Sequence, residues 1–373
     1  MTGNGSAGTA ATRIARMAKT APRWVLDSGP QVAEIVTSRV RLARNLASTP
    51  FPPRSTPEQQ SAVVNRLCRV TADLGGSAPE VFLPFDELPE GDLDFLVERR
   101  LASRELAHGH RRRGILVNAD EDVSVLVNEE DHLRLQTVLS GLRLGDALDR
   151  VADLDRELDT RLEYAYDPEF GYLTACPTNA GTGLRASVLA HLPALVLTRR
   201  AKKVVQGATA MGLAIRGFHG EGTELMGNFF QISNQTTLGR DENSIVNRLD
   251  EVVRQILGYE AEAREVMWGE ARVALEDKVY RAHATLGAAR SITADEVVSL
   301  ASAVRFGIAM EMEGLCSLAT LNTLLLFSQS AHVSRRAGRE LKPGERRVLR
   351  AEIVRGILAG GPPGEQESPS RGM

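Results

Sequence analysis

Apolar and polar positions follow two different periods along this chain, and the change of period divides it into two parts. In the segment 122–128 valine occupies every second position, as in a strand with two unlike faces. Similar short apolar runs alternate with turn residues up to about residue 240. From Asp241 to about Leu358 the apolar residues recur at helical spacing and strand signals vanish. The pattern predicts an α+β domain followed by an all-helical domain.

Individual elements follow from the same spacing. Residues 56–59 (TPEQ) have the form of a capping box with proline at the first helical position, so a helix is expected to begin there and to end near Gly75. Pro193 lies inside another segment of helical spacing and is expected to kink or shorten that helix. Further helices are predicted over residues 93–106, 145–162 and 184–197, and strands over residues 114–118, 122–128, 211–216 and 228–233.

Composition and charge narrow the classes of function. Of the 373 residues, 43% are hydrophobic and 25% are charged, and the formal net charge is −3. These values are ordinary for a soluble protein and give no reason to expect nucleic acid or a membrane as a partner. No stretch is long and apolar enough to cross a bilayer. The widely spaced Cys68, Cys176 and Cys316 form neither a metal cluster nor a disulfide framework, which favours a reducing cytoplasm.

The first stretch that is dense in functional side chains is TSRVRLARN, residues 37–45. If this stretch is extended, Arg39 and Arg41 project to the same side. Two guanidinium groups on one face can clamp a phosphate. The alternative is a solvated basic edge.

The second stretch is NEEDHLR, residues 128–134, which directly follows a β-rich run. A carboxylate such as that of Glu130 at the end of a strand is well placed to hold a substrate cation. The alternative is a charged turn. His132, taken alone, is more often structural than catalytic.

The third stretch, TACPTNAGTGLRAS at residues 174–187, is rich in small residues and is expected to open onto a helix. Free N–H groups at such a helix start attract anions, and Arg185 adds positive charge. The spacing is neither that of a P-loop nor that of a dinucleotide fingerprint. Cys176 is either a buried small residue or, beside cationic groups, a thiolate.

The fourth stretch is RGFHGEGTE, residues 216–224, in which glycines flank His219 and Glu221. A loop of this kind can close over a ligand. The alternative is an ordinary hairpin connection.

Together these stretches predict phosphoryl transfer to a guanidinium group. Arginines from separate segments can neutralise a polyphosphate without a P-loop. Glu130 and Glu221 can grip a fork-shaped cation and accept its proton during transfer. Magnesium needs no acidic cage, because it is held largely by phosphates and water. The arginines in question are Arg39, Arg41, Arg134, Arg185 and Arg216.

Several stretches resemble the signatures of the ATP:guanidino phosphotransferase family, which includes creatine and arginine kinases. TSRVRLARN, VNEEDHLR, CPTNAGTGLR and ISNQTTLG occur in this order from about Ile35 to Arg240. LRASVLAHLPALVLTRR, RGFHGEGTELMGNFFQISNQTTLG and LEDKVYRAHATL resemble the bacterial branch that phosphorylates arginine side chains of proteins. The resemblance implies an α+β phosphagen-kinase catalytic domain, with a large antiparallel sheet flanked by helices, followed by an all-α domain.

The resemblance also implies site residues. Glu130 and Glu221, with Cys176 beside them, are implied as catalytic contacts to the substrate guanidinium. Arg100 stands where the bacterial branch usually has a histidine that touches ATP, and it keeps the positive charge. The other implied ATP contacts are Thr37, Ser38, Arg39, Val40, Arg41, Arg134, Arg185, Ala186, Ser187, Val188, Leu189, Arg216, Gly217, Phe218, His219, Gly220 and Glu221.

Domain roles follow from the same resemblance. Residues 1–31 are expected to form a flexible extension, residues 32–264 the catalytic domain, residues 265–359 a helical dimerisation and regulatory domain, and residues 360–373 a disordered tail. The branch carries an Arg-Asp-x-x-Arg-Ala motif that binds phosphoarginine allosterically. Here an arginine replaces the acid, so the site is expected to be altered or lost, the alternative being a basic helix face. The matching residues are Arg346, Arg347, Arg350 and Ala351.

The partners are implied by the resemblance as well. ATP and Mg²⁺ are expected as cofactors, and arginine-containing proteins as substrates that phosphorylation marks for a Clp protease in the stress response. An activator protein and a homodimer are also implied. A kinase for free arginine or another small guanidine, and a non-catalytic phosphoarginine adaptor, remain alternatives. Small-guanidine kinases place a sizeable helical domain before the first arginine motif, and Arg39 comes too early for one here.

Overall fold

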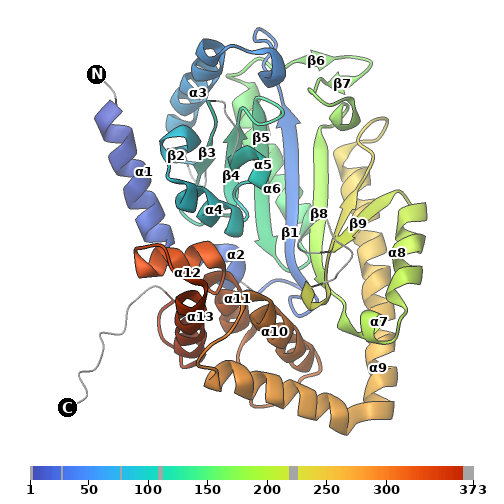
Figure 1. The fold of residues 1–373 in the computed structure, drawn as a ribbon. Coiled ribbons are helices and arrows are strands. Elements are labelled where there is room, and N and C mark those ends of the chain that lie inside the picture. Colours follow the sequence, from blue (N-terminus) through green and yellow to red (C-terminus); the bar gives the residue numbers. More distant parts are fainter. Residues whose placement is uncertain (1–2, 27, 76–77, 108–111, 218–225, 364–373) are drawn as a thin grey trace, which may run out of the picture.

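An eight-stranded antiparallel sheet forms the centre of the protein (Figure 1). The computed structural model describes residues 3–26, 28–75, 78–107, 112–217 and 226–363. The strand order is β2-β3-β4-β5-β1-β8-β10-β9, and each neighbouring pair is antiparallel. The strands are β1 Ile35–Arg44, β2 Val81–Pro84, β3 Gly114–Val117, β4 Val123–Val127, β5 Leu133–Ser140, β8 Leu184–His191, β9 Leu213–Gly217 and β10 Phe229–Asn234, with a separate hairpin of β6 Tyr166–Asp167 and β7 Gly171–Tyr172. The predicted α+β fold with a large antiparallel sheet is confirmed.

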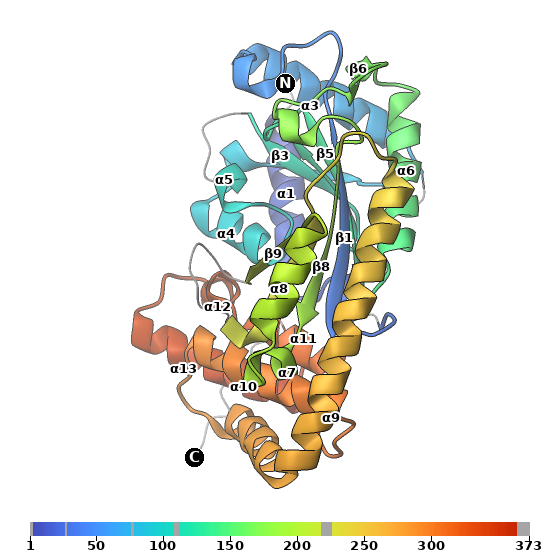
Figure 2. The same cartoon turned by 90° about the vertical axis from the view of Figure 1, so that its right-hand side faces the viewer.

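The helices lie on both sides of this sheet and at one end of it. Figure 2 shows α6 and α9 on one side and α4 and α5 on the other. The helices are α1 Gly3–Met17, α2 Arg23–Leu26, α3 Pro57–Ala72, α4 Glu90–Glu98, α5 Arg104–Ala107, α6 Leu144–Asp159, α7 Pro193–Leu197, α8 Ala201–Ala210, α9 Glu242–Ala288, α10 Ala294–Ala309, α11 Leu318–Phe327, α12 Ser330–Ala337 and α13 Pro343–Leu358.

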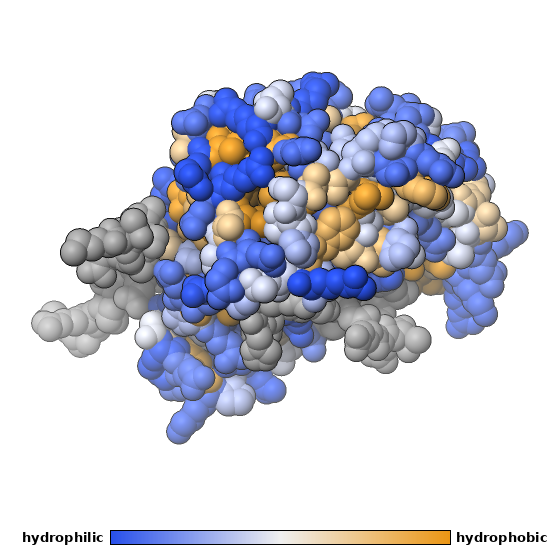
Figure 3. Space-filling model, turned by 90° about the horizontal axis from the view of Figure 1, so that it is seen from above, coloured by the Kyte–Doolittle hydropathy of each residue, from blue (hydrophilic) through white to orange (hydrophobic). Residues whose placement is uncertain are grey.

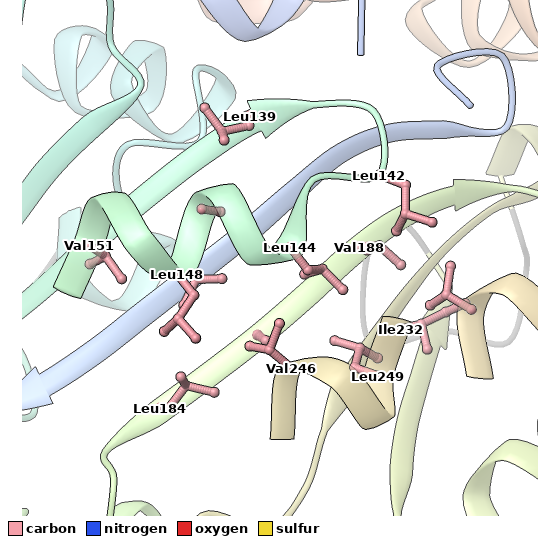
Figure 4. Close-up of a cluster of buried hydrophobic side chains, with 14 of the residues drawn as sticks. Leu139, Leu142, Leu144, Leu148, Val151, Leu184, Val188, Ile232, Val246 and Leu249 are labelled. Carbon is pink, nitrogen blue, oxygen red and sulfur yellow. The ribbon is translucent and has the colours of Figure 1, made fainter. Parts of the chain in front are cut away.

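The main core lies between the sheet and the helices α3, α6 and α9. Alternate residues of each strand point into it, because successive side chains of a strand face opposite sides. Figure 4 shows Leu144 and Leu148 of α6 and Leu249 of α9 gathered over Leu184 and Val188 of β8. Because the core covers this face of the sheet, the side chains on the opposite face of the central strands are available to line a binding site.

The C-terminal helices form a second core at one end of the sheet (Figure 1). The helix α9 runs from the sheet into this part and is interrupted at Ala271, whose φ is −140° and ψ is 31°. Arg305 of α10 is fully buried and donates hydrogen bonds to the carbonyl groups of Val32 and Ala33, just before β1. These bonds join the helical part to the first strand of the sheet.

The predicted helix after residue 56 is confirmed, together with its cap. Thr56 Oγ1 accepts a hydrogen bond from the Gln59 N–H at 3.3 Å, and Gln59 Oε1 accepts one from the Thr56 N–H at 2.9 Å. The segment 93–106, predicted as one helix, is divided between α4 and α5.

The prediction of a helix over residues 184–197 is wrong for most of that segment. Leu184–His191 is the strand β8, and only Pro193–Leu197 is helical, with Pro193 at the start of α7. Apolar and polar residues alternate from Leu184 to Val188, as in a strand, but the mainly apolar run from Val188 to Leu197 hides this short pattern. The small-residue loop therefore opens onto a strand, and the proposed anion site at a helix start does not exist there.

The prediction of a flexible extension over residues 1–31 is wrong for the part that the structure describes. Gly3–Met17 is the helix α1, and Ala10, Ile14 and Met17 are buried together with α4 side chains. Arg13 is buried as well and donates to the carbonyl groups of Asn118 and Ala119. The spacing of four and three residues between these apolar positions is helical, but small and polar neighbours obscure it. Residues 364–373, most of the expected disordered tail, lie outside the described ranges.

Candidate active site

One face of the central strands carries arginines instead of apolar side chains. In β1, Val40 and Leu42 point into the main core, so Arg39 and Arg41 point to the other face. Arg41 lies opposite Gln136 of β5 and opposite Arg185 of β8 in the strand register. Directly opposed residues are neighbours on one face of a sheet. Strand pairing therefore brings Arg39 and Arg41 close to Arg185, which lies about 150 residues further along the sequence.

These arginines border a cavity of about 550 Å³. Cavities of ~300–1,000 Å³ are typical of small-molecule sites. The predicted arginines from separate segments do converge, and Arg100 from the loop after α4 joins them. The part of the lining that is basic or carries an amide comprises Arg39, Arg41, Arg100, Arg134, Arg185, Arg216, Asn179, Gln136, Gln231, Asn234 and Gln235.

The electrostatics of this cavity favour an anion. Burial, and then the nearby guanidinium groups of Arg185 and Arg134, lower the pKa of Arg39 to about 10. Burial and then Arg39 lower the pKa of Arg100 to about 9 and that of Arg41 well below its usual range. Within the described ranges, no carboxylate forms an ion pair with Arg39, Arg41 or Arg185. A bound polyphosphate would relieve this concentration of positive charge.

Two neighbouring glutamates in the turn between β4 and β5 have different environments. Glu129 forms an ion pair with Arg134 and accepts a hydrogen bond from Ser103 Oγ at 3.1 Å. Glu130 lies 3.9 Å from Arg134, accepts from Asn179 Nδ2 at 3.3 Å, and has 43% of its side chain exposed. Glu130 is therefore at the rim of the cavity, where an incoming cation can reach it.

A buried polar network holds this turn against the loop that carries Cys176. Asp131 Oδ1 accepts hydrogen bonds from Asn45 Nδ2 at 2.6 Å and from the Ala175 N–H at 2.7 Å. His132 Nδ1 accepts from the Leu46 N–H at 3.1 Å, and burial lowers the pKa of this imidazole to about 4. His132 is thus structural, as predicted. The roles of Asn45 and Asp131 were missed in the sequence, where only their position beside the motif arginines and glutamates marks them.

Cys176 begins the loop at the rim of the cavity. Its half-buried thiol lies 3.0 Å from Thr178 Oγ1. Thr178 and Asn179, which follow it, line the cavity, and Asn179 also contacts Glu130. The structure therefore places Cys176 and Glu130 at the same edge of the site. Figure 3 views the end of the molecule at which the β6–β7 hairpin lies, and shows a mainly hydrophilic surface with smaller hydrophobic areas.

Some implied ATP contacts do not face the cavity. The side chains of Val40, Ala186 and Val188 point into the main core, because they alternate with the cavity-facing residues of their strands. Only their backbone groups remain available to a ligand. Leu189 packs against the helical part, and Ser38 Oγ bonds to the Gly141 carbonyl and the Arg143 N–H, at 2.8 and 2.9 Å.

The remaining implied contacts lie on the polar face of the sheet, on β9 or outside the described residues. Thr37, Arg39, Arg41, Arg185 and Ser187 share the polar face, since they occupy alternate positions of β1 and β8. Arg216 and Gly217 lie on β9, and Arg216 lines the cavity. Phe218, His219, Gly220 and Glu221 lie outside the described residues, so the second predicted carboxylate is not placed.

The residues predicted for phosphoarginine binding all lie on α13, but two of them are buried and two are not. Arg350 is buried and donates to the Ser328 carbonyl at 2.7 Å and the Ile292 carbonyl at 3.2 Å, while Ala351 is fully buried in the second core. These two positions are therefore structural rather than ligand-facing. Arg347 is exposed, and Arg346 lines a separate cavity of about 1380 Å³ between α4, α12 and α13.

The described part of the chain holds neither a candidate metal cluster nor a candidate membrane span. No three His, Cys, Asp or Glu side chains there are grouped so that they could hold a metal ion. No helix there combines the length and the apolar character needed to cross a membrane.

An antiparallel sheet that gathers arginines around a cavity, with carboxylates at its rim, defines a phosphotransferase of the phosphagen-kinase class. The family model "ATP:guanido phosphotransferase, C-terminal catalytic domain" matches residues 62–263, and "Protein-arginine kinase McsB C-terminal domain" matches residues 272–369. The protein-arginine kinase of Moorella thermoacetica is 45% identical over 347 residues, covering 91% of this chain and 97% of that protein. That of Symbiobacterium thermophilum is 42% identical, covering 90% of this chain and 96% of the relative.

Solved structures of the same class are more distant. The duplicated taurocyamine kinase of Schistosoma mansoni is 28% identical, with a TM-score of 0.58; the match covers 69% of this chain and 39% of that duplicated chain. Lombricine kinase is 25% identical, with a TM-score of 0.54, and the match covers 65% of this chain and 71% of that one. The chain belongs to the ATP:guanido phosphotransferase family and, within it, to the family of protein-arginine kinases; it is an ATP-dependent kinase.

Proposed function

We propose that this chain transfers the γ-phosphoryl group of ATP to arginine side chains of proteins. The observation that carries the proposal is the cavity on the polar sheet face, in which Arg39, Arg41 and Arg185 find no carboxylate partner among the described residues. Beside it, the exposed carboxylate of Glu130 lies where a cation from solution can reach it. The relatives named protein-arginine kinases support an arginine in a protein as that cation.

In this proposal the arginines bind the triphosphate and stabilise the transferring group. Guanidinium groups form paired hydrogen bonds to phosphate oxygens and remain charged near neutral pH. Arg39, Arg41 and Arg185 project from adjacent strands, so their positions are set by the sheet and need little rearrangement on binding. Mg²⁺ would add charge neutralisation while being held by the phosphates and water, which fits a site whose described part holds no cluster of acidic metal ligands.

The acceptor guanidinium must be oriented and must lose a proton as its nitrogen attacks. A free guanidinium has a pKa above ~12 and is a poor nucleophile. Glu130 is proposed to bind it and to act with Glu221, which lies outside the described residues, as the proton acceptor. Cys176, at the same rim as Glu130, is proposed to contact the guanidinium and to help orient it.

The test compares protein-bound with free arginine as the acceptor. The chain is incubated with ATP and either a casein-like protein or free arginine, and phosphoarginine is measured by mass spectrometry under conditions that preserve the acid-labile P–N bond. Transfer to the protein supports the proposal. Transfer to the free amino acid alone would make the chain a small-guanidine kinase, and transfer to neither, with phosphoarginine binding retained, would make it an adaptor.

The wider role is proposed on the same basis. Phosphoarginine would mark substrates for a Clp protease in the cytoplasm during stress, with an activator protein controlling the kinase. A homodimer through the helical part, residues 265–359, is supported by exposed apolar side chains on the C-terminal portion of α9. These residues are Val266, Val273 and Tyr280. Light scattering of the wild type and of a Val273→Glu variant tests the dimer.

A further inference from the structure

Three consecutive charged residues, the last residue of α4 and the two that follow it, contact three different parts of the protein. Glu98 contacts the helical part, and Arg99 forms a buried ion pair with Glu121 between β3 and β4. Arg100 lines the arginine cavity. Because these residues are covalently adjacent, movement of one is transmitted to the next.

Arg100 owes its direction to an unusual backbone conformation. Its φ is +63°, in the left-handed region that residues other than glycine seldom adopt. The Arg100 N–H bonds to the Val97 carbonyl and the Leu101 N–H bonds to the Leu96 carbonyl, both at 3.0 Å. This pair of bonds is the Schellman termination of a helix, in which glycine usually occupies the place of Arg100. An arginine there must be held by its surroundings.

The side chain of Arg100 is held inside the cavity. Its guanidinium lies 3.4 Å from Thr37 Oγ1 and 5.3 Å from the ring of Trp24, and its carbonyl accepts from Gln136 Nε2 at 3.3 Å. Thr37 and Gln136 are on the strands that form the polar face. The turn therefore presents a cation to the proposed nucleotide site.

Arg99 anchors the same turn from behind. Its side chain is fully buried and forms a two-pronged ion pair with Glu121, with distances of 2.7 and 2.6 Å. It also donates to the Thr20 carbonyl at 3.0 Å and lies 3.4 Å from His332 Nε2. A buried, bidentate arginine has few alternative positions, so Arg99 limits how the turn can move.

Glu98 attaches the turn to the helical part. Its carboxylate accepts hydrogen bonds from the Ala331 N–H at 2.7 Å, from the His332 N–H at 3.0 Å and from His332 Nδ1 at 2.7 Å. These N–H groups belong to the first turn of α12, whose own preceding residue, Gln329, forms no side-chain cap. A carboxylate from α4 thus supplies the cap that α12 lacks.

We propose that Glu98 and Arg99 are positioning residues, through which the docking of α12 sets the orientation of Arg100 and therefore the affinity for ATP. This rests on the proposed role of Arg100 at the nucleotide site. The contact makes ATP binding dependent on where the helical part lies. Any event that moves α12 away from Glu98 would raise the KM for ATP before it affected the chemical step.

The experiment measures the KM for ATP and kcat in the full chain, with a casein-like protein as acceptor, for Arg100→Ala, Glu98→Gln and the double variant. Loss of a charged contact to phosphate should raise the KM about 10-fold in Arg100→Ala. Glu98→Gln should raise it by about 3- to 5-fold, and the double variant should match Arg100→Ala, because Glu98 acts only through Arg100.

Asp92→Asn is the matched control. Asp92 of α4 forms an ion pair with Arg335 of α12, so this variant weakens the same interface without touching the last turn of α4. It should lower the unfolding temperature but leave the KM for ATP unchanged, because the Glu98 carboxylate still caps α12 and keeps its first turn in place. Equal KM changes in Asp92→Asn and Glu98→Gln, or additive effects in the double variant, would overturn the proposal, since both would indicate general loosening of the interface.

Two further variants keep the test decisive. If Glu98→Gln fails to fold, His332→Gln replaces it, because this change removes the imidazole contacts to Glu98 and Arg99, leaves the two backbone N–H bonds to Glu98, and should give the same selective rise in KM. Glu98→Asp should restore part of the wild-type KM. An unchanged KM in Arg100→Ala would overturn this inference while leaving the proposed function intact, which Arg39→Ala tests separately.

Discussion

Arg41 of β1 lies directly opposite Arg185 of β8, on the sheet face that points away from α6 and α9. Like charges in directly opposed positions of a sheet are destabilising. Burial and the neighbouring guanidinium groups lower the pKa of both side chains, so each would be more easily accommodated without its charge. A bound anion between the two guanidinium groups would neutralise their repulsion. The proposed ATP site depends on this effect.

Arg41→Ala should therefore remove activity without removing stability. Loss of one cation at the transferring phosphoryl group is expected to lower kcat/KM by about 100- to 1,000-fold. The free energy of unfolding without ligand should stay the same or rise by about 0.2–1 kcal/mol, since a like-charge contact is relieved. Steady-state kinetics and urea unfolding of the ligand-free chain measure the two effects.

The control for this prediction is Arg156→Ala. Arg156 forms an exposed ion pair with Asp153 on α6, and such pairs contribute little to stability. Activity and unfolding should both match the wild type. A loss of more than about 2 kcal/mol in Arg41→Ala, with ATP binding retained, would show instead that Arg41 is a structural residue.

Glu130→Gln should separate the acceptor site from the ATP site. Glu130 is partly exposed at the rim, so the substitution should change stability by less than about 0.5 kcal/mol. Loss of a carboxylate that binds the guanidinium and receives its proton should lower kcat by about 100- to 10,000-fold. Calorimetric titration with ATP should give the wild-type affinity.

Its neighbour provides the contrast. Glu129→Gln breaks the ion pair with Arg134, which lines the cavity, so this variant should change the affinity for ATP as well as the rate. If Glu130→Gln weakened ATP binding as strongly as Glu129→Gln, the assignment of Glu130 to the acceptor would be wrong.

The shared face of Arg39 and Arg41 could be predicted from the sequence because side chains alternate in any extended segment. Their approach to Arg185 could not be derived from periodicity, since it depends on which strand pairs with β1. That pairing follows from long-range packing, and the apolar run that joins the end of β8 to α7 hides the short alternation of Arg185 and Ser187. The stretch 174–187 marked Arg185 as a candidate anion contact without showing that a strand carries it.

Other features had weaker signals in the sequence. The turn formed by Glu98, Arg99 and Arg100 looks like ordinary helix-end charge, because Glu121 and His332 are distant along the chain. Arg100, whose backbone is in the left-handed region, also occupies the position at which a glycine would have marked the end of the helix. Only the folded contacts distinguish this turn from a solvated one.

Asp131→Asn should weaken the support of the Cys176 loop. The carboxylate accepts from both Asn45 Nδ2 and the Ala175 N–H, and an amide at this position would retain one acceptor oxygen but bring a second NH₂ group into a buried site. A loss of about 1–3 kcal/mol in stability is expected. Because the loop carries Cys176 and Asn179, kcat should fall more than the affinity for ATP changes. The control Asp167→Asn, at the exposed turn of the β6–β7 hairpin, should alter neither stability nor kcat. A normal kcat in Asp131→Asn would show that the network does not position the loop.

Glu260 on α9 should make stability depend on pH. Its carboxylate accepts from the N–H groups of Ala194 and Leu195, both at 2.9 Å, and burial raises its pKa from 4.5 to about 7. A raised carboxyl pKa in the folded state contributes stability below the unfolded value and loses that contribution as pH rises through about 7. Glu260→Gln stays neutral, so its free energy of unfolding relative to the wild type should increase between pH 4.5 and 7.5 by up to about 3 kcal/mol.

Urea titrations at several pH values measure this difference, and the exposed Glu262→Gln on the same helix should show no such trend. A constant difference for Glu260→Gln across this range would mean that the two N–H groups hold the carboxylate ionised throughout.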